Sequence, residues 1–132
     1  MTFAPNCRLG KIGKFCFQNS GLEELQLPQG LLELGDEAFA DCRNLRAVQK
    51  NKGLKAVSNG CFRNSGLEAL TVPASVRKIG CGAFQNCKHL EKLEFAEESQ
   101  LKQVKKWAFV GTALVRERID FPPKTHVEKG AF

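Results

Sequence analysis

The segment Leu67–Cys87, with the sequence LEALTVPASVRKIGCGAFQNC, decides the fold of this chain. Its frame, L-x-x-L-x-V-P-x-x-V-x-x-I-G-x-x-A-F-x-x-C, recurs along nearly the whole sequence. The clearest marker is a phenylalanine that follows a small residue at intervals of 22, 23, 22, 25 and 23 residues: Phe17, Phe39, Phe62, Phe84, Phe109 and Phe132. Five frames are nearly complete and a sixth stops at the last residue, so the chain is a repeat protein.

A longer periodicity lies on top of this frame. At an offset of 45 residues, fourteen positions between residues 16 and 45 recur identically between residues 61 and 90. Odd frames read F-x-N-S-G-L, and even frames read F-x-x-C-x-x-L. The sequence therefore looks like a duplicated pair of repeats.

Each frame predicts one coil of a solenoid. Leu67, Leu70 and Val72 alternate with polar residues, which indicates a short strand with one buried face. Pro73 ends that strand because proline has no backbone donor for a ladder. The large ring in the step Ala83–Phe84 predicts a tight turn or a single helical turn on the outer side. One coil cannot bury its own apolar face, but stacked coils form a continuous core.

The frame resembles the treponemal, BspA-like class of leucine-rich repeat, whose consensus is L-x-x-I-x-I-P-x-x-V-x-x-I-G-x-x-A-F-x-x-C. The resemblance runs from about Leu9 to Phe132, with departures at Lys50, at Glu117 and in a two-residue insertion within Glu97–Gln100. It implies a curved, right-handed solenoid with a parallel sheet on its concave side. The resemblance also implies binding of macromolecules at the surfaces of bacteria and protists.

We therefore expect an α/β leucine-rich-repeat solenoid of five to six coils that fills a single domain, residues 1–132. The repeats are expected at about residues 9–28, 31–50, 54–73, 76–95, 101–121 and, in part, 124–132. A length below about 150 residues leaves room for one core. The hydrophobic fraction of 42% and the charged fraction of 26% are close to globular averages. No apolar run approaches the roughly 18 residues of a transmembrane span.

The ends of the chain leave the compartment open. Met1–Phe17 lacks the uncharged apolar stretch of a secretory signal, so the protein stays inside the cell or a signal lies outside this sequence. The sixth frame is incomplete, and an uncovered terminal coil exposes core residues and strand edges. Three explanations stay open: a piece of a longer array, an end covered by a partner or a second copy, and a coil completed by other means.

The six cysteines are expected to be free thiols. Cys42 and Cys87 occupy a small buried position of the frame, and Cys16 and Cys61 occupy its alanine position. The members of each pair lie two coils apart, which is roughly 9.5 Å and exceeds the ~7 Å limit for a disulfide. These four cysteines are expected to be small buried residues of the core, whereas Cys7 and Cys81 occupy neither of the two positions. Free thiols favour a reducing compartment, whereas the family resemblance implies the cell surface.

The positive charge is concentrated in one segment of the repeat. The seven residues from the second short strand to the small-Phe step carry formal charges that together equal +6 over the six frames, which is the net charge of the chain. Stacking predicts a basic strip in the C-terminal half, made of Lys55, Arg77 and Lys102 in one column with Lys78, Lys105, Lys106 and Trp107 beside it. Such a strip suits an anionic surface, and it equally suits a purely solubilising role. Trp107 favours binding because tryptophan is a common interface anchor.

The outward positions of the strand face differ from the strip in character. They are mixed in sign and poor in aromatic residues, and they include Glu23, Arg46, Glu68, Glu91 and Arg116. A mixed polar face suits recognition of a protein better than recognition of a nucleic acid.

The sequence contains no pattern of a catalytic or cofactor site. The two histidines, His89 and His126, lie in different frames, and no Ser/His/Asp, H-E-x-x-H or phosphate-loop pattern occurs. We expect no enzyme activity, cofactor, metal site or small-molecule substrate. The sequence predicts a module that binds a macromolecular partner, in the first place a protein. A polyanion-binding or cell-surface adhesin that uses the basic strip and a structural subunit of a larger assembly stay open as alternatives.

Overall fold

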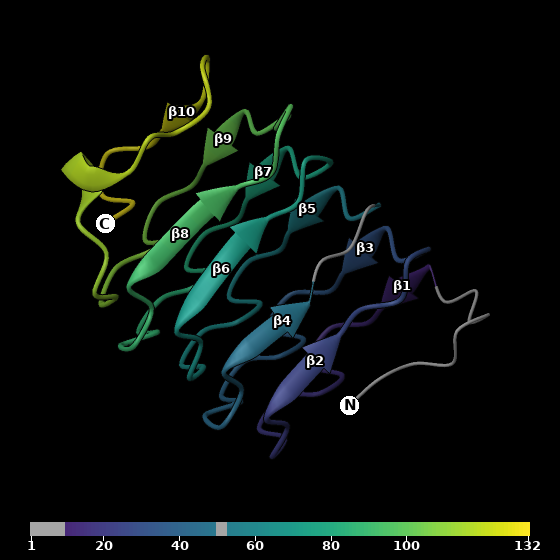
Figure 1. Ribbon diagram of the computed structural model, residues 1–132. Coiled ribbons are helices and arrows are strands. Elements are labelled where there is room, and N and C mark those ends of the chain that lie inside the picture. Colours follow the sequence, from purple (N-terminus) through teal and green to yellow (C-terminus); the bar gives the residue numbers. More distant parts are fainter. Residues whose placement is uncertain (1–9, 50–52) are drawn as a thin grey trace.

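The chain forms a solenoid of stacked coils, and each of the first four coils contains two short strands joined by a turn (Figure 1). The computed structural model describes residues 10–49 and 53–132. One row of strands consists of β2 (Glu24–Gln26), β4 (Ala47–Gln49), β6 (Ala69–Val72) and β8 (Lys92–Phe95). The other row consists of β1 (Lys11–Ile12), β3 (Glu33–Leu34), β5 (Ala56–Val57), β7 (Lys78–Ile79), β9 (Gln103–Val104) and β10 (His126–Val127). We call the outer surfaces of these rows the long-strand face and the short-strand face.

Every strand pair is parallel, so equivalent residues of successive coils lie side by side. In the long-strand row β2 pairs with β4 and β6 pairs with β8, while β5, β7, β9 and β10 form one continuous sheet in the other row. Hydrogen bonds bridge the breaks: the Glu68 N–H donates to the Arg46 carbonyl (3.3 Å) and the Lys55 N–H to the Leu32 carbonyl (3.1 Å). The predicted columns of the repeat are therefore real neighbours in space.

The alternation expected of the strands is present. In β2, Leu25 is buried between exposed Glu24 and Gln26. The strand β6 ends at Val72, directly before Pro73, as predicted, because a proline cannot donate to the ladder.

The third side of the solenoid consists of turns around a stack of phenylalanine rings. The rings of Phe17, Phe39, Phe62, Phe84 and Phe109 follow one another at 5.2–5.5 Å between centroids, with planes within 7° of parallel. Phe132 continues the stack at 5.2 Å with a tilt of 24°. In this column each amide donates to the carbonyl of the small residue of the next coil, for example Phe84 N–H to Ala108 O at 2.8 Å.

The turns on this side carry a left-handed residue at each end. The first left-handed column is Phe15, Glu37, Gly60, Gly82, Trp107 and Gly130, and the second is Asn19, Asp41, Asn64, Asn86 and Gly111. Within residues 10–49 and 53–132 the structure contains one helix, the 3-10 helix η1 (Arg116–Arg118), and it lies away from the Ala-Phe step. Of the two expected alternatives at that step, the tight turn is present and the helical turn is not confirmed. No helix in the described part of the chain is long and apolar enough to cross a bilayer.

Departures from the repeat frame change the structure of the chain locally. Where the frame expects a strand with leucine, coil five has Glu117 in η1, fully outside the core. The insertion before β9 forms a turn with Glu98 in the left-handed region (φ 59°). Lys50 lies outside the described residues.

Three of the four expected core cysteines are buried. Cys42, Cys61 and Cys87 lie in the core, whereas Cys16, in the first coil of the described stack, is exposed, contrary to expectation. Cys42 and Cys87 each lie beside a serine of the preceding coil and donate to a phenylalanine carbonyl, at 3.2 and 3.1 Å. Burial raises the pKa of Cys61 to about 12, and burial also raises the pKa of Cys87. The five described cysteines are all free, Cys81 is exposed, and Cys7 lies outside the described residues.

We predict that a thiol reagent separates these cysteines into two groups. In a Cys7→Ser background, native protein should be labelled quickly at Cys16 and Cys81, because a buried thiol is inaccessible and stays protonated. Cys61 should stay unlabelled even at about pH 10, since its folded pKa is about 12. Peptide mapping after timed labelling measures this, and rapid native labelling of Cys42, Cys61 or Cys87 would contradict the packing described above.

Candidate binding surfaces

The basic strip predicted from the sequence lies on the short-strand face. The register of β5, β7 and β9 places Lys55, Arg77 and Lys102 in one column directly before these strands. Backbone hydrogen bonds of 2.8 Å join Arg77 to Lys55 and Lys102 to Arg77. All three side chains are exposed. Successive charges in the column are therefore separated by one strand spacing, about 4.8 Å at the backbone.

The remaining residues of the strip are more varied. Lys78 is exposed on β7. Lys105 is half-buried and forms an ion pair of 3.3 Å with Glu128, so its charge is compensated. Among the residues that the structure describes, no carboxylate lies within ion-pair distance of Lys55, Arg77, Lys78 or Lys102.

The long-strand face carries a column of mostly acidic residues. Glu23, Arg46, Glu68 and Glu91 precede the four strands, and amide-to-carbonyl bonds of 2.9–3.3 Å link each to the next. All four are exposed. The structure therefore brings together four of the five strand-face candidates. Arg116 lies apart from them in η1, with its guanidinium carbon 5.4 Å from the centre of the Phe121 ring.

A shallow hollow of about 300 Å³ lies at the centre of the long-strand face. The equivalent positions Ala47 and Ala69 leave it open because both side chains are small, and Thr71 adds a hydroxyl. Lys92 and Glu94, which pair at 3.3 Å, line the side formed by β8. The sequence had not predicted this hollow, because a small residue at an outward strand position has no signature in a single frame.

A groove of about 240 Å³ crosses the turn side next to Trp107. Trp107 is 48% exposed and left-handed (φ 67°), a conformation that favours glycine. The same column holds Gly60 and Gly82 in the two preceding coils, so two of the positions that line the groove have no side chain. Lys106 lies over the indole, with its ammonium nitrogen 4.8 Å from the ring centre.

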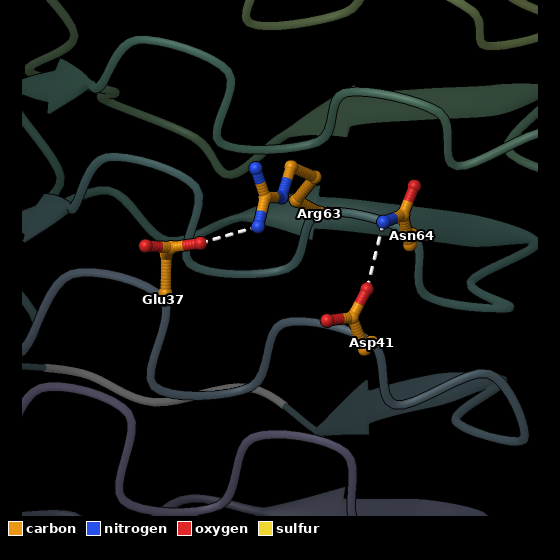
Figure 2. Close-up of polar contacts among 4 residues, drawn as sticks. All are labelled: Glu37, Asp41, Arg63 and Asn64. Carbon is orange, nitrogen blue, oxygen red and sulfur yellow. Dashed lines mark hydrogen bonds and ion pairs between the residues drawn. The ribbon is translucent and has the colours of Figure 1, made fainter.

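An ion pair between successive coils lines the same groove. Figure 2 shows the guanidinium of Arg63 reaching back to the carboxylate of Glu37, which belongs to the same left-handed column as Trp107. In the neighbouring column the amide nitrogen of Asn64 donates to Asp41 at 2.7 Å. Glu37, Arg63 and the two glycines were missed as site residues from the sequence. Alignment of the frames would have found them, since a glycine in two successive frames between large residues marks a gap in a column.

The described part of the chain contains no cluster of three histidine, cysteine, aspartate or glutamate residues that could hold a metal ion. The histidines lie on different sides: His89 is exposed in a turn, and His126 is exposed on β10.

Comparison with known proteins connects this architecture to one repeat family. Residues 10–132 match the model of the BspA type leucine rich repeat region, in six copies. No curated protein matches the chain significantly.

Several solved structures are similar to the chain. A leucine-rich repeat protein from Bacteroides ovatus has a TM-score of 0.79 and 29% identity, over 89% of this chain and 30% of that one. The pneumococcal vaccine antigen PcpA has a TM-score of 0.64 and 25% identity, over 68% of this chain and 22% of that one. A leucine-rich-repeat protein from Treponema pallidum, at 21% identity and a TM-score of 0.60, shares the fold over 71% of this chain and 50% of its own. This chain thus spans between 22% and 50% of the length of these three structures.

A substitution of Trp107 tests whether its indole is needed for folding. We predict that Trp107→Gly leaves the free energy of unfolding within about 1 kcal/mol of the wild type, because relief of the left-handed backbone offsets the lost contacts. Gly82→Ala, in the same column, should lower it by about 1–2 kcal/mol because alanine is strained at this φ of 62°. Urea denaturation measures both values. A loss above about 2 kcal/mol for Trp107→Gly would show that the indole is a structural residue.

Proposed function

Because the chain belongs to the family of BspA-type leucine-rich-repeat proteins, we propose that it is a non-enzymatic module that binds another protein through its long-strand face. The family fold commonly serves as a scaffold for protein interaction. The repeat itself accounts for nearly every apolar residue, which leaves the exposed columns as the part of the chain that is free to bind.

The hollow at the centre of the long-strand face carries the proposal. Ala47 and Ala69 let a partner side chain approach the backbone of β4 and β6, while charged and polar groups surround the hollow. A small apolar centre with a polar rim is the usual composition of a protein interface. The mixed signs of Arg46, Lys92 and Glu94 suit the separate hydrogen bonds of a protein surface better than a uniform polyanion.

A second function is favoured by the basic strip. Lys55, Arg77 and Lys102 are exposed, stacked at the strand spacing and without ion pairs among the described residues. A row of like charges at this spacing is electrostatically unfavourable unless a ligand or counterions compensate it. Binding of a sulfated glycan or another polyanion would supply that compensation and release counterions from the polymer.

Photo-crosslinking tests the protein-binding proposal. A benzophenone amino acid replaces Thr71 in the hollow, or, as the matched control, exposed Ala113 at a turn of coil five. After irradiation in an extract of the organism that makes the protein, discrete adducts should form from position 71 and be absent from position 113. Ala69→Arg should abolish them because its side chain fills the hollow. Equal adducts from both positions, or none from position 71, would overturn the proposal.

Salt-dependent retention on immobilised heparin tests the second function. The triple variant Lys55→Gln, Arg77→Gln and Lys102→Gln should elute earlier, and the slope of log K against log salt should fall by about 2–3, since each phosphate or sulfate contact contributes roughly 0.7–0.9. The control triple Lys14→Gln, Arg46→Gln and Arg118→Gln removes the same charge from other surfaces. Identical elution of the two variants would show that net charge, and no specific strip, governs retention.

A further inference from the structure

The alternation of odd and even coils creates a notch on the turn side that no surface described above includes. In coil two the Leu45 N–H donates to the Cys42 carbonyl at 3.1 Å, and in coil four the Leu90 N–H donates to Cys87 at 3.0 Å. Each of these turns has two residues between the cysteine and the leucine. Coil three, between them, has Gly66 alone at the equivalent place, so its turn is one residue shorter.

Gly66 keeps the floor of the notch without a side chain. A Cβ at this position would lie 2.5 Å from the carbonyl oxygen of Arg43 and 3.1 Å from that of Leu45. Backbone atoms cannot yield to such a contact, so coil three cannot fill the gap. The result is a notch of about 430 Å³ lined by Arg43, Asn64, Gly66, Asn86, Lys88 and His89.

The walls of the notch are cationic, and no carboxylate belongs to its lining. Arg43 comes from one wall, and Lys88 and His89 come from the other, two strand spacings or about 9.5 Å away at the backbone. Both long side chains can therefore reach one group held between the walls. Asn64 belongs to the second left-handed column, whose acidic member is Asp41. The carboxylate of Asp41 accepts a hydrogen bond of 2.7 Å from the side-chain amide of Asn64, which fixes the orientation of that amide (Figure 2).

We propose that this notch binds a sulfate or phosphate group carried by a ligand. A guanidinium donates two parallel hydrogen bonds to such an oxyanion, and an ammonium adds a point charge from the opposite side. The Asn86 amide and the exposed imidazole of His89 provide further donors. The volume exceeds that of a single ion and leaves room for the ring to which the group is attached. The site goes beyond the proposed function and does not depend on it, because it lies on the turn side and the binding surfaces proposed above lie on the strand rows.

Titration with inorganic sulfate and with inorganic phosphate, followed by amide chemical shifts, tests the site. Both ions should shift the Gly66 amide in a saturable way, whereas chloride at matched ionic strength should not. The double variant Arg43→Gln and Lys88→Gln should weaken binding at least about tenfold, as expected for loss of charged hydrogen bonds. The control Lys14→Gln and Arg118→Gln, which makes the same change in net charge at exposed residues outside the proposed binding surfaces, should keep the wild-type affinity. No saturation, or an equal loss in both variants, would overturn the proposal.

Glucose 6-sulfate and glucose 6-phosphate distinguish the two possible sources of the oxyanion, with glucose as the uncharged control. The ester for which the notch is built should bind more tightly than its free ion, because the ring occupies the remaining volume. Glucose binding at the same affinity as the esters would contradict the role of the cationic walls. Lys88→Gln alone, at an exposed position, repeats the test if the double variant does not fold.

Discussion

The stack of phenylalanine rings, one per coil at 5.2–5.5 Å, is the constraint on which the rest of the structure depends. The spacing of the rings is close to the spacing of hydrogen-bonded strands, so ring stacking and backbone pairing favour the same distance between coils. The residue before each ring must be small, because it faces the same crowded core. Every other position is then locked into a column, and a change of residue type within a column alters the surface locally without disturbing the stack.

Much of the architecture could be predicted because the successive frames of the sequence can be aligned with one another. Equivalent residues of successive frames become neighbours, so the column of Lys55, Arg77 and Lys102 could be read from the sequence and agrees with the register of the strands. The buried positions of Cys42, Cys61 and Cys87 followed from the same alignment. What the alignment predicts is which residues share a column, and that prediction depends on nothing beyond regular stacking.

The features that were wrong or missed depend on breaks in that regularity. Cys16 is exposed although it occupies the alanine position of the frame, and Arg116 leaves the strand face because Glu117 cannot fill a core position and the segment becomes η1. A turn could not be distinguished from a helical turn at the Ala-Phe step, since the left-handed ends are occupied by asparagine, glutamate or tryptophan as well as glycine. The hollow, the groove and the notch were missed because each alanine or glycine was interpreted within its own frame, whereas these surfaces are gaps between neighbouring residues of a column.

The two strand faces differ in sign, and this separates the two proposed functions. On the long-strand face, exposed Glu23, Glu24, Glu68, Glu91 and Glu94 outnumber Arg46 and Lys92, whereas the short-strand face exposes Lys55, Arg77, Lys78 and Lys102. A polyanion is attracted to the second face and repelled from the first, because the local potential follows the nearest charges within about a Debye length of 8–10 Å. The two proposed functions therefore use different surfaces. A solenoid only two strand rows thick can carry both, since each row presents its own columns and the phenylalanine stack fixes both rows at the same spacing.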